Sequence, residues 1–115
     1  MANDPSFNGQ SAEYWLRTRL SGDDEARWEA IDAIRHICAP DVSVLLFVDT
    51  LRKDSYWRAR ALAAHASYDL AFDHSEVPRL ISAKPYFLAA LNDSSAEVRE
   101  QVKELLGVLE NGESA

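Results

Sequence analysis

The sequence lacks the features that mark disulfide-stabilised, secreted or membrane-spanning proteins. It contains a single cysteine, Cys38, so no disulfide can form within the chain. No apolar run approaches the ~20 residues that a membrane-spanning helix needs. Residues 1–10 are polar and contain no hydrophobic segment typical of a signal peptide. We therefore expect a cytoplasmic protein.

Basic residues are also few. Lys and Arg total 12 against 19 Asp and Glu, which gives a net charge of −7 at pH 7. Because nucleic-acid binding depends on cations that neutralise phosphates, a nucleic-acid partner is disfavoured. The same charge disfavours an anionic membrane surface and favours a basic protein partner.

Apolar residues, in contrast, are abundant. Hydrophobic residues make up 47% of the chain and include three Trp, four Tyr and four Phe, which is ample for one small domain. Residues 1–10 offer little to bury and are expected to form a flexible arm. The domain is expected to cover residues 11–110, followed by a frayed tail at 111–115.

The stretch from Leu91 to Leu109 shows the clearest helical signal. Ser94 and Glu97 have the spacing of a capping box, which predicts that a helix begins at Ser94 or Ser95. Apolar residues then recur at helical spacing and form one stripe for burial: Val98, Val102, Leu105 and Leu109.

Caps and prolines divide the rest of the chain into further helices, which predicts an all-α fold with about six helices and no sheet. Breaks are expected near residues 22, 40, 54, 73–84 and 93. The helices pair into three antiparallel hairpins, at about 11–38, 40–71 and 84–110. Pro78 and Pro85 are too close to share one undistorted helix, so residues 73–83 are expected to form an insertion with one helical turn at most.

The three hairpins resemble copies of one repeating unit. Arg27, Arg58 and Arg99 recur at intervals of 31 and 41 residues, and apolar columns keep the same two offsets. This alignment makes Arg58 the structural arginine of the second unit and places Trp57 in the same buried column as Val98. The apolar columns are Leu16/Phe47/Leu88, Ala30/Ala61/Val102 and Ile37/Tyr68/Leu109.

The third unit contains the patterns L-x-D, at residues 91–93, and V-R-x-x-V, at residues 98–102. With its three hairpins, the chain over residues 12–110 resembles a HEAT-repeat protein. The first two units depart from the family pattern, because the acid before each arginine, Asp23 or Asp54, lies four residues upstream instead of six. The resemblance implies a short right-handed α-solenoid whose second helices line a concave, protein-binding face.

The repeat columns also predict which residues of each second helix face away from the core. The outer two helices present mainly carboxylates, and the middle helix presents Tyr56 and Arg60. Such a face suits a basic peptide or helix, because Tyr and Arg anchors dominate interface energies. An ordinary solvated surface is the competing interpretation. The predicted partner-binding residues are Tyr56, Arg60, Glu29, Asp32, Gln101 and Glu104.

Other clusters carry weaker signals. Residues 52–60 interleave basic and aromatic side chains like a nucleic-acid-stacking patch, but the column alignment favours a structural role for them. Residue types that ligate metals also recur at helical spacing: His65, Asp69, Asp73, His74 and Glu76. His65 shares a column with Ile34, so a hydrogen-bonded core histidine is favoured over a metal ligand. Cys38 is expected to be an inert core thiol. No metal or cofactor is expected.

The favoured function is a non-enzymatic protein-interaction module, a scaffold or adaptor, that acts as a monomer or weak dimer. No catalytic triad, Cys-His pair or phosphate-binding loop is evident in the sequence. Two alternatives stay open. The resemblance also covers enzymes, because some HEAT-like proteins are bilin lyases or alkylated-base DNA glycosylases. The chain could instead be a subunit that stacks end to end in a longer solenoid.

Overall fold

The computed structural model describes residues 6–72 and 76–114, with side chains described as far as residue 111. Seven helices hold 79% of these residues, and two short strands form the only sheet within them. The elements in chain order are β1 (Ser6–Phe7), β2 (Gln10–Ser11), α1 (Ala12–Ser21), α2 (Asp24–Ile37), α3 (Pro40–Lys53), α4 (Trp57–Leu70), α5 (Val77–Ser82), α6 (Lys84–Ala90) and α7 (Ala96–Ser114). The prediction of a mostly helical domain is confirmed, whereas the predictions of about six helices and no sheet are wrong.

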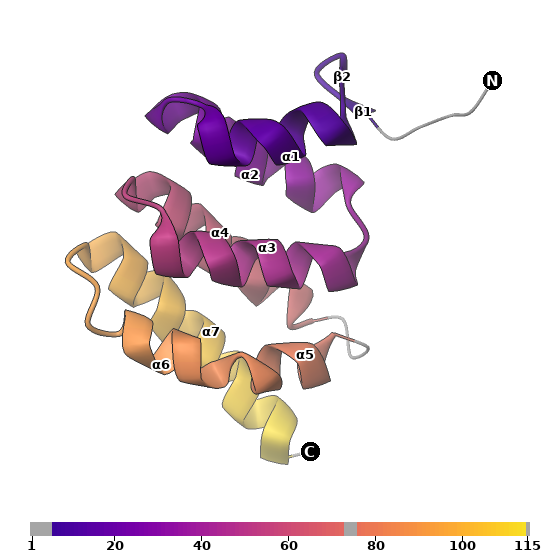
Figure 1. The fold of residues 1–115 in the computed structure, drawn as a ribbon. Coiled ribbons are helices and arrows are strands. Elements are labelled where there is room, and N and C mark those ends of the chain that lie inside the picture. The colour runs from indigo at the N-terminus through magenta and orange to yellow at the C-terminus, as the bar shows by residue number, and fades with distance from the viewer. Residues whose placement is uncertain (1–5, 73–75, 115) are drawn as a thin grey trace.

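The helices pack pairwise in three tiers that follow the order of the chain (Figure 1). The tiers consist of α1 with α2, α3 with α4, and α5 and α6 with α7. One layer contains α1, α3, α5 and α6, and the other contains α2, α4 and α7 (Figure 1). We call these the first-helix layer and the second-helix layer.

The N-terminal strands form a tight hairpin against the first tier. Asn8 and Gly9 have positive φ angles of 51° and 77°, as a two-residue type I′ turn requires. The indole Nε1 of Trp15 donates to the carbonyl of Phe7 at 3.0 Å, and the Phe7 ring stacks on His36 with centroids 5.1 Å apart. The predicted flexible arm is therefore wrong for residues 6–10, and residues 1–5 lie outside the described part of the chain.

Side-chain caps begin several helices, as the sequence predicts. Asp23 accepts the Ala26 amide at 2.9 Å and begins α2. At α7, Ser95 accepts the Val98 amide at 3.5 Å, and the helix begins at the next residue. The start at Ser95 is confirmed, whereas the capping box predicted at Ser94 is wrong.

Two segments are more helical than predicted. The insertion predicted at residues 73–83 contains α5, which is six residues long, and residues 73–75 lie outside the described part. Pro85 lies in the first turn of α6, where its missing amide hydrogen costs no hydrogen bond. The backbone of α7 is helical to Ser114, so the frayed tail is wrong for residues 111–114.

The core surrounds α4, which packs against α2, α3 and α7. Four of its alanines are buried, and their small side chains let the neighbouring helices approach closely: Ala59, Ala63, Ala64 and Ala66. Ile34 of α2 and Leu105 of α7 are fully buried on either side. The predictions that Ile34 and Leu105 belong to the core are confirmed.

Two buried ion pairs connect consecutive tiers. The guanidinium of Arg27 donates to both carboxylate oxygens of Asp54 at 3.1 Å. That of Arg60 donates to both oxygens of Asp93 at 2.8 and 2.9 Å, and these side chains are only 12% and 11% exposed. In each pair, an arginine near the start of one second-layer helix binds the aspartate that precedes the next one, which fixes the spacing of the tiers.

The same arginines identify the true repeat. Arg27, Arg60 and Arg99 each donate through Nη1 to a carbonyl five or six residues upstream, at 2.9, 2.9 and 2.6 Å. The structural arginine of the second unit is therefore Arg60, and the prediction of Arg58 is wrong. The repeat offsets are 33 and 39 residues, so the sequence alignment of α4 was two residues out of register. Trp57 is accordingly not in the core, because 43% of it is exposed.

Candidate functional site

The corrected repeat defines which residues of the second-helix layer point outward. Three rows of equivalent positions are Glu25/Arg58/Glu97, Glu29/Leu62/Gln101 and Asp32/His65/Glu104. Contacts across the layer agree with this alignment, because Arg58 lies 3.6 Å from Glu25 and 5.1 Å over the ring of Trp28. We call these nine residues, with Tyr68 and Phe72 further along the chain, the second-helix face.

The four predicted site residues on the outer helices lie on this face. Glu29 and Glu104 are exposed. Asp32 is half-buried and accepts a hydrogen bond from Arg35 Nε at 2.9 Å. Gln101 is half-buried, and its Oε1 atom has no hydrogen-bond partner in the described structure. All four therefore lie in the outward-facing rows of α2 and α7, on either side of α4.

The two predicted central residues lie elsewhere. Arg60 faces inward and binds Asp93, so it is not an exposed anchor. Tyr56 precedes α4, and its hydroxyl donates to Glu25 Oε1 at 2.5 Å. This hydrogen bond raises the pKa of Tyr56. The structure brings Arg58, Leu62 and His65 to the middle of the face instead.

An aromatic row continues from this centre along α4 and just past its end. The ring of His65 stacks on Tyr68 with centroids 6.1 Å apart, and Tyr68 meets Phe72 edge to face at 5.1 Å. Phe72 is 61% exposed and the His65 side chain is 43% exposed, so the prediction of a core histidine is wrong. The ring of Phe72 is therefore accessible and is held in place by its contact with Tyr68.

Carboxylates of α2 and α7 flank the centre of the face, where Arg58, Leu62 and His65 lie. The arginines of this layer are already engaged, Arg58 by Glu25 and Arg35 by Asp32 and Asp69. Within residues 6–72 and 76–111, no cationic side chain pairs with the exposed carboxylates Glu29, Glu97 and Glu104. The face therefore combines an aromatic row, which runs from its centre towards the end of α4, with uncompensated negative charge on α2 and α7.

The weaker sequence clusters form no site in the described structure. His65 Nε2 lies 3.7 Å from Asp69, and Glu76 instead contacts Arg79 at 2.8 Å. No group of three or more potential ligands lies together among the described residues, and Asp73 and His74 fall outside them. Burial raises the pKa of the Cys38 thiol, in keeping with an unreactive thiol.

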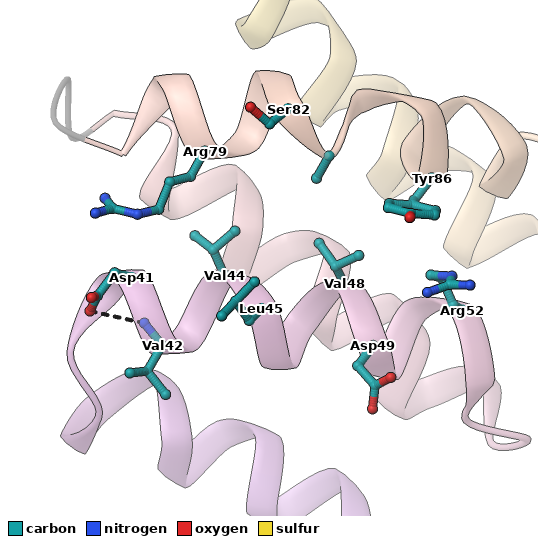
Figure 2. A pocket seen from close by; sticks show the side chains of 11 residues that line it. Asp41, Val42, Val44, Leu45, Val48, Asp49, Arg52, Arg79, Ser82 and Tyr86 are labelled. Atoms are coloured by element: carbon teal, nitrogen blue, oxygen red, sulfur yellow. Dashed lines mark hydrogen bonds between the residues drawn. The ribbon is translucent and has the colours of Figure 1, made fainter.

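A groove of about 600 Å³ lies in the other layer, between α3 and the α5–α6 segment (Figure 2). Val44, Val48 and Ala83 line it, and Arg52 lies over the Tyr86 ring at its far end, 4.4 Å from the centroid. Leu45 at its edge is 71% exposed. The groove was not predicted from the sequence, because its two sides belong to different repeats.

Comparison with known proteins identifies no relative from which a function could be inferred. No protein-family model matches the chain, and no curated protein or solved structure is significantly similar to it. In the described part of the chain, no helix has the length and apolar character needed to cross a bilayer.

Proposed function

We propose that this chain is a non-enzymatic protein-interaction module of HEAT-repeat type that binds a basic segment of a partner protein. The observation that carries the proposal is the aromatic row of half-buried His65 and Tyr68 and exposed Phe72, with unpaired carboxylates on the helices at either side. Exposed aromatic clusters rimmed by charge are characteristic of protein-binding surfaces.

The two parts of the face have different tasks in this proposal. The aromatic row buries apolar parts of the partner and provides ring faces for Lys or Arg side chains. Glu29, Glu97 and Glu104 attract the basic segment before contact and orient it across α4. Affinity then depends mainly on the rings, and the rate of association depends mainly on the carboxylates.

The resemblance to HEAT repeats belongs to the same proposal. It is supported by three stacked hairpins and by the spacing of six residues from Asp54 to Arg60 and from Asp93 to Arg99. In a curved solenoid of this kind the second helices line the concave side. A concave second-helix face would wrap around a bound segment, which increases the area buried.

A peptide array tests the proposal even though the partner is not identified. Labelled protein is applied to basic, neutral and acidic peptides, and affinities for the best sequences are measured by surface plasmon resonance at two salt concentrations. We expect basic peptides to bind, with affinity falling as salt screens charges beyond about 8–10 Å. Phe72→Ala should weaken binding by about 1–3 kcal/mol, chiefly through faster dissociation.

Matched controls lie on the other layer. Leu20 of α1 is 69% exposed, so Leu20→Ala removes an equally accessible apolar group and should leave binding unchanged. Glu29→Gln with Glu104→Gln should slow association, whereas Glu13→Gln on α1 should not. A lack of preference for basic peptides, or equal effects of Phe72→Ala and Leu20→Ala, would refute the proposal.

The alternative of end-to-end stacking has one observation in its favour and one against it. Arg99 occupies the arginine position of the last tier, and no carboxylate pairs with it among the described residues. A second copy would not supply the missing aspartate from its own first tier, however, because the equivalent position, 33 residues before Asp54, is Ser21. Head-to-tail stacking of identical copies is therefore disfavoured.

A further inference from the structure

The groove beside α3 is bordered by a stripe of four residues whose spacing along the helix is symmetric about its midpoint. Asp41, Leu45, Val48 and Arg52 recur at i, i+4, i+7 and i+11, so they lie along one side of the helix, and all four line the groove (Figure 2). The stripe therefore has a carboxylate at one end, two apolar side chains in the middle and a guanidinium at the other end. The outer pair, Asp41 and Arg52, and the inner pair, Leu45 and Val48, are both centred between residues 46 and 47.

We propose that α3 is a self-association surface on which a second copy of this chain docks with its own α3 antiparallel. A two-fold axis through the midpoint of the stripe places Asp41 of each copy opposite Arg52 of the other. It likewise places Leu45 of each copy opposite Val48 of the other. Self-complementarity of this kind is what an isologous dimer interface requires.

The charges at the two ends of the stripe are available for such contacts. Asp41 is exposed and accepts a hydrogen bond from the amide of its neighbour Val42 at 3.0 Å. Arg52 is exposed and lies over the Tyr86 ring, 4.4 Å from the centroid. Neither forms a salt bridge with any described residue. The ring holds the Arg52 side chain in place, which lowers the entropy lost on pairing.

The apolar groups between these charges fit the same arrangement. Leu45 is 71% exposed, and Val42 beside it is 42% exposed. Leu45 of one copy would enter the groove of the other next to Val48, which is buried at the groove wall. Asp49 does not oppose the contact, because Arg19 and Lys53 already bind it at 2.9 and 2.8 Å.

The arrangement is compatible with the proposed function but does not depend on it. The α3 stripe belongs to the first-helix layer, so a dimer formed through it leaves both second-helix faces free (Figure 1). Two faces on one particle would bind a partner with repeated basic segments more tightly than one face does.

Sedimentation equilibrium over a wide concentration range tests the dimer directly. Because one helix pair buries a small interface, we expect weak self-association with a dissociation constant between about 1 µM and 1 mM. Leu45→Glu should abolish it, and Phe72→Ala on the opposite layer should leave it unchanged. A wild-type protein that stays monomeric over the whole range overturns the proposal.

Charge reversal tests the pairing itself. Asp41→Arg places two arginines opposite each other at both ends of the dimer, and Arg52→Asp places two aspartates there. Each variant alone should raise the dissociation constant by roughly tenfold or more. In a mixture of the two variants both ends pair arginine with aspartate, so heterodimers should form with nearly wild-type affinity.

The mixing experiment separates pairing from damage to the fold. Circular dichroism of each variant shows whether it is folded, and a misfolded variant could not regain association on mixing. If the wild type dimerises but the mixture does not, the dimer uses another surface and the proposal is wrong. If binding of a different partner helix is what the groove serves, the wild type remains monomeric, which also overturns it.

Discussion

At the scale of single residues, two aspartates make stability depend on pH. Burial is the largest influence on Asp93 and raises its pKa, but hydrogen bonds from Arg60 and the Ser95 amide outweigh it and lower the pKa overall. Hydrogen bonds from Lys53 and Arg19 lower the pKa of Asp49. Both carboxylates are therefore more acidic in the folded protein than in the unfolded chain.

The sign of the pH dependence follows from linkage. An unfolded aspartate has a pKa of about 3.9, and a lower folded pKa means that the unfolded chain binds protons first as the pH falls. The stabilisation is complete well above pH 4 and is lost as the pH drops through the folded pKa values. Urea unfolding should show a lower free energy at pH 3 than at pH 7.

Two variants test whether Asp93 contributes to this loss of stability at low pH. Asp93→Asn should lower stability at pH 7 and reduce the difference between pH 7 and pH 3, because one of the two groups no longer titrates. Ile34→Val, in the fully buried core, should cost about 0.5–1.5 kcal/mol at both pH values. An unchanged pH difference in Asp93→Asn would contradict the proposed linkage.

At the scale of elements, the start of α7 gives a sharp test of capping. Ser95 accepts the Val98 amide, whereas the adjacent Ser94 is exposed and lies outside the cap. Ser95→Ala should destabilise the domain by about 0.5–1 kcal/mol, and Ser94→Ala should change stability by less. The same thermal or urea melts measure both, and an equal or reversed ranking would show that the helix begins one residue earlier.

Local signals predicted the elements well because they act within a few residues of sequence. The breaks predicted near residues 22 and 40 lie where the structure begins α2 and α3. The N-terminal hairpin was missed, although Asn8-Gly9 is a strong signal for a type I′ turn. The low apolar content of residues 1–10 was given more weight, and the anchoring of Phe7 by Trp15 depends on a tertiary contact.

The repeat alignment failed where local pattern and tertiary contact disagree. Placing Trp57 and Arg58 against Val98 and Arg99 matched apolar and basic residue types, but the links between hairpins differ in length. The six-residue spacing from Asp54 to Arg60 equals that of the third unit and could have identified the register. The ion pairs between tiers establish the register. They are tertiary contacts, because Arg27 and Asp54 are separated by 27 positions in the chain and Arg60 and Asp93 by 33.

At the scale of the whole molecule, the register determines which residues of α4 the second-helix layer exposes. Turning Arg60 inward towards Asp93 turns Arg58, Leu62 and His65 outward between the acidic helices. The carboxylates of α2 and α7 were predicted as a group, because an error in α4 does not affect them. The aromatic row was not predicted, since finding it required the correct register of the middle tier.

Two double-mutant cycles test this register by measuring the free energy of unfolding. One cycle removes Arg60 and Asp93, and the other removes Arg58 and Glu25. The first pair is nearly buried and bidentate, so its members should couple by about 2–3 kcal/mol in urea unfolding. The second pair is exposed, with side chains 44% and 67% accessible, and should couple by less than about 1 kcal/mol. Stronger coupling between Arg58 and Glu25 than between Arg60 and Asp93 would show that the register is wrong.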